Sequence, residues 1–342
     1  GKTVLLVEIE SLAEKEDFFV IRLEAQEDKS ITIELAKEIR RILLNMSTLS
    51  SVGVKLKKGL SVFLAFVKAF KISVGDMAIE VSPELGTADS GDIEDDMPHL
   101  LTAVAEAAQE HNTGIALIID EIHELTPKEL NGIIVAMHRI QQKQLPFVLI
   151  GAGLPTILAK AGKAKTYSER LFDYPQIGAL SEEDTDRALS DPVEKEGMAF
   201  EDTALKSIYE HTQGYPYFIQ TWGHQTWDCA ESSPFTTELV EQASIKSLTE
   251  LDQSFFRVRF DRLTPKEKEF MHAMAKLNAE HRKVRDVAAL LGTTVTNVSK
   301  VRESLIKKGM IYSPSHGDIA FTVPLFDEFM LRKMRKQKAV AV

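Results

Sequence analysis

The sequence predicts an α/β protein in which a parallel sheet with crossover helices is followed by a helical domain and a winged helix-turn-helix domain. Three observations lead to this fold class. Up to residue 165, short apolar runs typical of buried strands alternate with segments of helical periodicity. From 166 to 253 the patterns are helical, and from 254 to 342 helical segments lead into a short hairpin. We therefore expect three domains, over 1–165, 166–253 and 254–342.

The elements of the first domain are predicted from the spacing of their apolar residues. Segments with helical spacing predict helices, and short β-branched or aromatic runs predict buried strands. The residue pair Thr126-Pro127 is a good cap and first turn for a helix, and the alternating run around Gly75-Asp76 predicts a hairpin over 70–83. The expected helices are 3–13, 31–44, 52–70, 97–110 and 125–142, and the expected strands are 18–23, 115–120 and 147–150.

The remaining elements are predicted in the same way. A helix-Gly-helix arrangement around Gly292, closed by Gly309, indicates a helix-turn-helix. Two apolar runs within 310–323 then predict its hairpin wing. The expected helices are 181–189, 201–211, 215–230, 236–251, 265–277, 284–291 and 293–308.

The composition is that of an ordinary globular protein, with 342 residues, 44% hydrophobic and 27% charged. The single cysteine, Cys229, allows neither an internal disulfide nor a cysteine-based zinc site, which fits a cytoplasmic location. No apolar run approaches the roughly 18 residues of a membrane span, so we expect no membrane partner. The chain opens on Gly1-Lys2-Thr3, without Met or a signal peptide, and we expect it to be a truncated piece of a longer protein.

The charge is unevenly distributed. Residues 262–342 hold 16 Lys and Arg against 8 Asp and Glu, a net of +8. Because the whole chain carries −10, residues 1–261 carry −18. A basic C-terminal domain is suited to a polyanion such as DNA. The alternative is that the basic and acidic parts dock on each other.

Two adjacent carboxylates end a buried strand in the run Leu117-Ile118-Ile119-Asp120-Glu121. The carboxyl ends of parallel strands form the ligand-binding edge of an open α/β sheet. There Asp120 could hold Mg²⁺, and Glu121 could polarise an attacking water. The alternative is that both residues are solvated acids at the start of a helix.

The first three residues match the end of a phosphate loop. The motif G-x-x-x-x-G-K-[ST] precedes a helix, and here Gly1-Lys2-Thr3 is followed at once by an apolar helical pattern. Lys2 would reach the β- and γ-phosphates of ATP, Thr3 would offer its hydroxyl to Mg²⁺, and the helix amides would face the phosphates. A bare Gly-Lys-Thr also occurs by chance; the order of this motif, a strand and the Asp-Glu strand favours a nucleotide site. We expect its earlier residues to precede Gly1.

These two motifs, together with several later stretches of the chain, resemble the bacterial and archaeal ATPases related to STAND and origin-recognition-type AAA ATPases. The matching stretches are GKTVLL at 1–6, LIIDEIHEL at 117–125, LPFVLIGAGLP at 145–155, SERLFDYPQIGAL at 168–180, GYPYFIQTWG at 214–223 and FFRVRFDRLTPKEKEFM at 255–271.

The resemblance covers nearly the whole chain and implies roles for matching residues. Asp120 and Glu121 look like the Walker B pair, and Arg170 looks like an arginine finger for a neighbouring subunit's nucleotide. Gly214, Tyr215 and Pro216 look like the lid motif whose proline packs near adenine. The alternatives are a surface arginine and a simple interhelical turn.

Two departures from the family pattern predict slow turnover. The strand 147–150 is followed by Gly151-Ala152-Gly153, without the polar residue that AAA proteins usually place there, for which Thr156 is a weak substitute. The helix after Pro216 lacks the sensor arginine of origin-recognition-type proteins. Slow turnover suits a nucleotide-dependent switch better than a motor.

The third helix of the C-terminal domain predicts a DNA-reading face. Thr294, Thr296, Asn297, Lys300 and Arg302 form its polar side, whereas Val295, Val298, Val301 and Leu305 are expected to face the core. The expected phosphate ligands are Lys300, Arg302, Lys307, Lys308, Arg282 and Arg285. The alternative is an internal latch on the nucleotide domain.

The histidines show no metal-ligand spacing, and His123 is expected to be a surface residue at a helix start. Trp222 and Trp227 are expected in the core of the helical lid. The sequence thus predicts an ATP- and Mg²⁺-dependent switch with slow hydrolysis, coupled to double-stranded DNA and to a homo-oligomer or protein partner. The alternatives are a non-hydrolysing signalling scaffold and a DNA-binding regulator with a vestigial ATPase.

Overall fold

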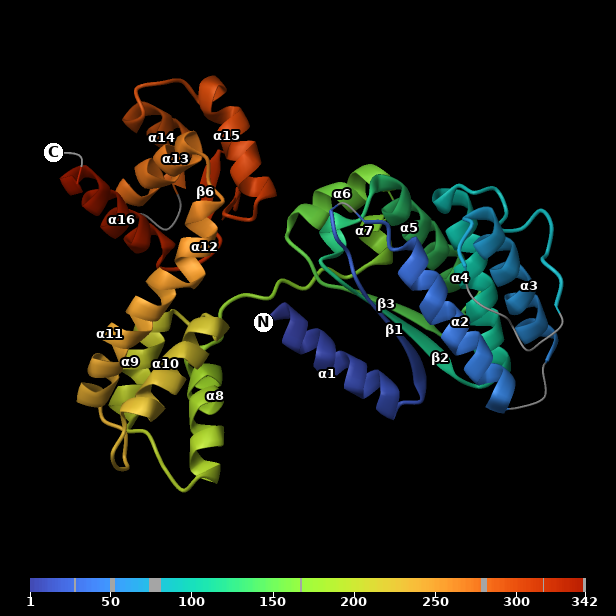
Figure 1. Ribbon diagram of the computed structural model, residues 1–342, viewed down its shortest axis with the longest axis horizontal. Coiled ribbons are helices and arrows are strands. Elements are labelled where there is room, and N and C mark those ends of the chain that lie inside the picture. The colour runs from blue at the N-terminus through green and yellow to red at the C-terminus, as the bar shows by residue number, and fades with distance from the viewer. Residues whose placement is uncertain are drawn as a thin grey trace. The chain divides into compact units, whose positions relative to one another are not determined.

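The computed structural model describes residues 1–27, 29–49, 53–73, 81–166, 168–277, 282–315 and 317–340. The chain divides into two compact units, residues 1–176 and 177–342 (Figure 1). Each unit has a large hydrophobic cluster of its own.

The first unit is built on a three-stranded parallel sheet. Its strands are β1 (Phe18–Glu24), β2 (Gly114–Asp120) and β3 (Phe147–Gly151), in the order β1-β2-β3. β2 pairs with both neighbours, and all its residues are buried. The predicted α/β class with a parallel sheet is confirmed, and the three predicted strands lie within about one residue of their expected ends.

Helices cover both faces of this sheet. They are α1 (Lys2–Lys15), α2 (Thr32–Leu49), α3 (Val54–Ala69), α4 (Ile93–Glu110), α5 (Pro127–Gln142), α6 (Thr156–Ala164) and α7 (Ser168–Leu171), with a 3-10 turn, η1, at Ile122–Glu124. The sequence patterns predicted neither α6 nor α7, and the central part of the hairpin expected over 70–83, residues 74–80, lies outside the described residues.

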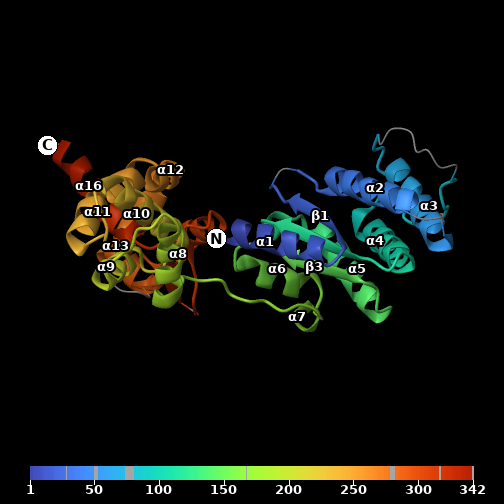
Figure 2. The same ribbon diagram turned by 90° about the horizontal axis from the view of Figure 1, so that it is seen from below.

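The alternation along β2 explains how the two faces are covered. Ala116 and Ile118 point to one face and pack with Leu6 of α1. Leu117 and Ile119 point to the other face and join the larger cluster formed with α2 to α5. Figures 1 and 2 show α1 separated from α2, α3 and α4. This arrangement brings the N-terminal end of α1 to the carboxyl end of β2.

The second unit begins with a helical part. It comprises α8 (Glu182–Lys195), α9 (Asp202–Thr212), α10 (Pro216–Cys229), α11 (Thr237–Gln253) and α12 (Phe255–Asp261). Trp222 is fully buried and donates its indole N–H to the Ser244 hydroxyl at 2.8 Å, as expected for a core residue. Trp227 is 41% exposed, so its predicted place in the core is wrong.

The last part of the second unit combines helices with a small antiparallel sheet. Its elements are α13 (Pro265–Lys276), β4 (Arg282–Lys283), α14 (Val284–Leu290), α15 (Val295–Lys307), β5 (Ile311–Tyr312), β6 (Asp318–Phe321) and α16 (Phe326–Val340). The strand order is β4-β6-β5, so the predicted hairpin is present and gains a third strand. One hydrophobic cluster runs from Leu189 of α8 to Met330 of α16. Among the described residues, no helix combines the length and apolar character needed to span a bilayer.

Candidate functional site

The first predicted site residues meet at the carboxyl end of β2. Thr3 donates its hydroxyl to Asp120 Oδ2 at 3.0 Å, which joins residues 117 positions apart. Asp120 is 8% exposed, and its second oxygen, Oδ1, accepts the Glu121 N–H at 2.9 Å. A hydroxyl and a carboxylate at this distance are two oxygen ligands of the kind that Mg²⁺ prefers. The residues present therefore fit a magnesium ion.

Lys2 and Gly1 lie beside this pair, at the start of α1. Lys2 is the first residue of α1 and is partly buried, whereas Gly1 is exposed and is the N-cap of the helix. A helix N-terminus presents unpaired amides and the positive end of the helix dipole, both of which favour phosphate. The residue types and their placement fit the phosphate groups of a nucleotide.

Glu121 follows Asp120 in an unusual backbone conformation. Its φ of 49° lies in the left-handed region, and it caps the 3-10 turn η1. Its side chain is 39% exposed, and Oε2 lies 3.3 Å from Nδ1 of His123. The strained turn carries Glu121 out of the strand direction while Asp120 stays buried.

His123 is buried, so its expected place on the surface is wrong. The residue is 6% exposed, and its Nε2 lies 3.1 Å from Oε1 of Glu124. Burial lowers the pKa of His123, an effect that Glu121 and Glu124 oppose and that Lys2 and Lys160 reinforce. The local sequence contains no signal of this burial, because η1 is covered by the distant turn after β3.

Arg170 lies in the same unit on the short helix α7. It is exposed and makes no hydrogen bond or ion pair with the described residues. An exposed guanidinium fits a role toward another molecule, and it also fits the plain surface alternative.

The three lid-motif residues lie in the second unit, in the turn between α9 and α10. Gly214 has a φ of +69°, and a Cβ there would lie 2.2 Å from the Leu180 carbonyl oxygen, so the turn requires glycine. Tyr215 packs on Phe218 with ring centroids 4.7 Å apart, and burial raises the pKa of its hydroxyl. Pro216 is the first residue of α10. Their nucleotide contact stays a prediction.

The predicted DNA-reading helix, α15, presents part of the expected face. Thr296, Asn297 and Lys300 are exposed. Val298 and Leu305 are buried as expected, but Val295 is 47% exposed, so its predicted core position is wrong. The polar face therefore has an apolar member at the N-terminal end of the helix.

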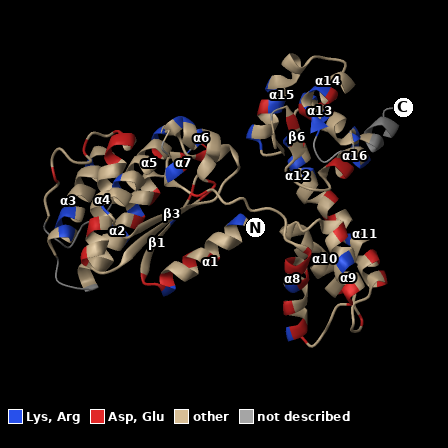
Figure 3. Cartoon of the chain, turned by 180° about the vertical axis from the view of Figure 1, so that it is seen from behind, with Lys and Arg blue, Asp and Glu red and all other residues tan. Residues whose placement is uncertain are grey.

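Several of the predicted phosphate ligands are engaged inside the second unit. Lys308 donates to Glu267 Oε2 at 2.7 Å, and Arg302 donates to the Ser313 hydroxyl at 3.0 Å. Arg282 is 5% exposed and donates to Asp327 Oδ2 at 2.9 Å, so its expected role toward phosphates is wrong. Lys307 and Arg285 are exposed. Figure 3 shows the basic residues of α15 and the acidic residues of α8.

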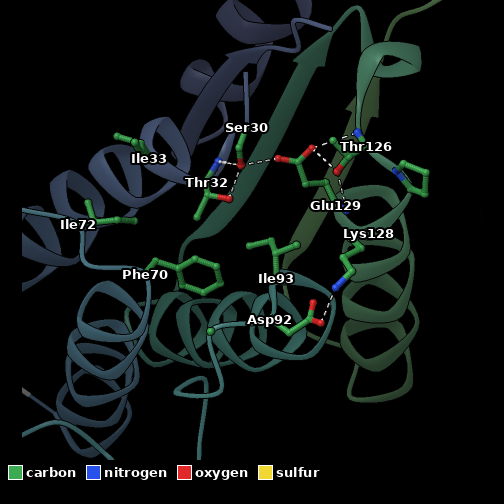
Figure 4. Close-up of a pocket in the computed structure, with 12 residues that line it drawn as sticks. Ser30, Thr32, Ile33, Phe70, Ile72, Asp92, Ile93, Thr126, Lys128 and Glu129 are labelled. Atoms are coloured by element: carbon green, nitrogen blue, oxygen red, sulfur yellow. Dashed lines mark hydrogen bonds and ion pairs between the residues drawn. The ribbon is translucent and has the colours of Figure 1, made fainter. Parts of the chain in front are cut away.

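A separate cavity of about 620 Å³ lies among the N-terminal ends of α2, α4 and α5 (Figure 4). Its polar side chains form hydrogen bonds and an ion pair with one another. Glu129 accepts from the Ser30 and Thr126 hydroxyls, each at 2.7 Å, and Lys128 pairs with Asp92 at 2.7 Å.

Comparisons with known proteins give distant similarities. Residues 253–330 match the profile of a family described as "Domain of unknown function (DUF8462)". Among curated proteins, none matches this chain.

Three solved structures illustrate the similarity over nearly the whole chain. Cdc6p from Pyrobaculum aerophilum has a TM-score of 0.41 and 12% identity, covering 98% of this chain and 85% of that one. The RuvB Holliday junction branch migration motor of Thermotoga maritima has a TM-score of 0.38 and 16% identity, covering 92% of this chain and 90% of that one. Orc1 of Aeropyrum pernix in complex with DNA has a TM-score of 0.37 and 13% identity, covering 96% of this chain and 90% of that one. Agreement at this level assigns no role to individual residues, so the site rests on the geometry of this chain.

Proposed function

We propose that this protein binds ATP with Mg²⁺ through its first unit and hydrolyses it slowly. The observation that carries the proposal is the hydrogen bond from Thr3 to Asp120. It joins the last residue of the phosphate-loop motif to the acidic residue at the tip of the central strand. Chance occurrences of the two short motifs would have no reason to meet at one edge of the sheet.

Each site residue has a role that its position supports. Lys2, with the first amides of α1, would bind the β- and γ-phosphates, and Thr3 and Asp120 would hold Mg²⁺, which neutralises phosphate charge when bound. Glu121 is partly exposed and would orient and polarise the attacking water. Arg170 would act on the nucleotide of a neighbouring copy in an oligomer, for which its exposure is suitable.

The second unit is proposed to convert nucleotide state into a conformational response. Its lid motif, Gly214 to Pro216, would contact the adenine side of the nucleotide. Its last part has the order helix, strand, helix, helix and hairpin, which is the order of a winged helix-turn-helix. Exposed Thr296, Asn297 and Lys300 on α15 would contact double-stranded DNA.

A non-hydrolysing nucleotide switch is the second candidate. The observation that favours it is the sequence Gly151-Ala152-Gly153 at the end of β3, which offers no side-chain donor to a γ-phosphate. In that case the C-terminal part would serve as an internal latch. If the protein is instead a DNA-binding regulator with a vestigial ATPase, α15 would still contact DNA, but the first unit would not hydrolyse ATP.

The nucleotide proposal is tested by measuring ATP affinity and phosphate release on this chain and on one extended upstream of Gly1. We expect the extended chain to bind and slowly hydrolyse ATP, and its Lys2→Ala form to lose both activities. Binding without turnover would establish the non-hydrolysing switch. An extended chain that binds no nucleotide would overturn the proposal.

The DNA proposal is tested by the salt dependence of duplex binding. We expect Lys300→Ala to weaken binding and to lower the slope of log affinity against log salt by about one. Lys206→Ala, at an exposed lysine of α9, is the matched control and should leave the slope unchanged. Equal slopes for the parent and both variants would exclude Lys300 from the interface.

A further inference from the structure

The buried imidazole of His123 contacts the candidate base directly, yet the proposed chemistry so far gives it no role. Its Nδ1 lies 3.3 Å from Oε2 of Glu121, and its Nε2 lies 3.1 Å from Oε1 of Glu124. The backbone N–H of Leu154, after β3, also points to Nδ1, at 3.3 Å. A single ring thus touches two carboxylates and one amide from another part of the chain.

The turn after β3 is shaped around this ring. A Cβ at Gly151 would lie 2.5 Å from Cδ1 of Ile122, and one at Gly153 would lie 3.1 Å from Nδ1 of His123. The two backbones are also joined, because the Ile122 N–H donates to the Ala152 carbonyl at 2.9 Å. Larger residues at either glycine would push the turn away. The Gly-Ala-Gly sequence, which lacks a polar side chain, lets the turn reach His123.

The hydrogen-bond partners of the ring decide which nitrogen carries the proton. Burial favours the neutral imidazole, which has one N–H and one acceptor nitrogen. The Leu154 N–H requires a lone pair on Nδ1, so the proton is on Nε2 and is donated to Glu124. Glu121 then faces a lone pair rather than a donor. The ring therefore limits the position of Oε2 by direct contact rather than by a hydrogen bond, which leaves the carboxylate able to accept from a water molecule.

We infer that His123 is a positioning residue for Glu121, which links the direction of the Glu121 carboxylate to the turn after β3. This inference rests on the proposed function, because it assigns Glu121 the role of the base. It also explains the absence of a polar side chain at the end of β3. The polar group at this place is the ring of His123, with its orientation set by the backbone of Leu154.

The experiment uses the extended chain and three variants, His123→Ala, His123→Asn and His224→Ala. His224 is an exposed histidine of α10 in the second unit and serves as the control. For His123→Ala we expect kcat to fall at least about tenfold, because a misdirected base slows the reaction, with ATP affinity within about threefold. For His123→Asn we expect much of kcat to return, since its amide oxygen can accept the Leu154 N–H.

A second readout, independent of turnover, is the ¹⁵N chemical shifts of the labelled histidine rings at neutral pH. We expect the resonances of His123 to be those of the tautomer protonated on Nε2. A tautomer protonated on Nδ1 would overturn the inference, because the ring would then donate to the Glu121 carboxylate and compete with the water molecule for it.

The outcomes separate this inference from the proposed function. A parent that hydrolyses ATP while His123→Ala keeps its kcat would overturn the role of His123 and leave the ATPase proposal intact. Equal losses of kcat and of unfolding stability in the Ala and Asn variants would show a packing role and would also overturn it. A parent that binds ATP without turnover would overturn the hydrolysis proposal, and the role of His123 with it.

Discussion

At the scale of single residues, the Thr3 hydroxyl connects the two halves of the candidate site. It belongs to the first turn of α1, and its acceptor, Asp120, ends the central strand. The hydrogen bond positions both oxygens at the edge of the sheet. The same two oxygens would hold Mg²⁺ under the proposed function, since hydroxyl and carboxylate are both suitable ligands.

Replacement of Thr3 by Val removes this hydroxyl at nearly constant volume. In the extended chain we expect Thr3→Val to reduce ATP affinity in the presence of Mg²⁺ at least about tenfold, the loss that corresponds to one charge-assisted contact. Affinity in EDTA should change little, because the hydroxyl acts through the ion. Calorimetric titration with and without Mg²⁺ measures the effect.

Thr3→Ser is the matched control for this prediction. It keeps the hydroxyl and should remain close to the parent. If Thr3→Val and the parent responded equally to Mg²⁺, Thr3 would have no part in the metal site.

At the scale of elements, Glu267 holds α13 and α15 together. Its carboxylate accepts from the Thr264 N–H, the Ser304 hydroxyl and the Lys308 ammonium, each at 2.7 Å. Burial by itself raises the pKa of Glu267, but these hydrogen bonds outweigh it and lower the pKa from 4.5 to about 2. The contact therefore stabilises the folded state when Glu267 is charged.

The lowered pKa predicts a pH-dependent stability. The contribution of Glu267 is fully present above its unfolded pKa of 4.5 and is lost as the pH falls from there toward about 2. We expect Glu267→Gln to reduce the free energy of unfolding by about 1–3 kcal/mol at pH 7, with a smaller difference at pH 3. Urea unfolding followed by tryptophan fluorescence measures this, since both tryptophans, Trp222 and Trp227, lie in the second unit.

The control for Glu267→Gln is Glu269→Gln on the same helix. Glu269 is exposed, so its replacement should be nearly neutral at both pH values. A parent and a Glu267→Gln variant that lost stability in parallel between pH 7 and pH 3 would contradict the assigned pKa.

At the scale of the whole molecule, the chain is two compact units joined by a segment without regular structure. Residues 172–181 contain no helix or strand, and the boundary between the units falls after Gln176 (Figure 1). Each unit buries its own hydrophobic cluster. Proteolysis is concentrated at exposed segments of this kind.

Limited digestion with chymotrypsin is expected to cut first near Phe172 and to release two folded fragments. Mass spectrometry should place their ends between residues 172 and 181. The second fragment should retain its tryptophan emission maximum, because Trp222 is enclosed within its cluster. First cuts distributed within either unit would instead show that the two are not independently folded. The domain boundaries expected from the sequence, at 165 and 253, remain predictions.

Much of the first unit could be predicted because the relevant signals are local. Apolar periodicity identified the strands, and a general rule places the ends of parallel strands at one edge of the sheet. Together with the phosphate-loop motif Gly1-Lys2-Thr3, these signals predicted that Thr3 and Asp120 serve one Mg²⁺, and the two side chains are joined by a 3.0 Å hydrogen bond. Helix α5 likewise begins at the predicted cap, where Thr126 and Glu129 form a capping box.

The sequence by itself therefore determined the α/β class, the three strands of the first unit with the helices between them, and the pairing of the two motifs. The tertiary structure decided which side chains are buried and which residues they contact. His123 is buried by a turn about 30 residues away, and Arg282 is buried through its ion pair with Asp327 on α16. The reason is physical: periodicity reports the face of a residue's own element, whereas its surroundings depend on which distant segment packs there.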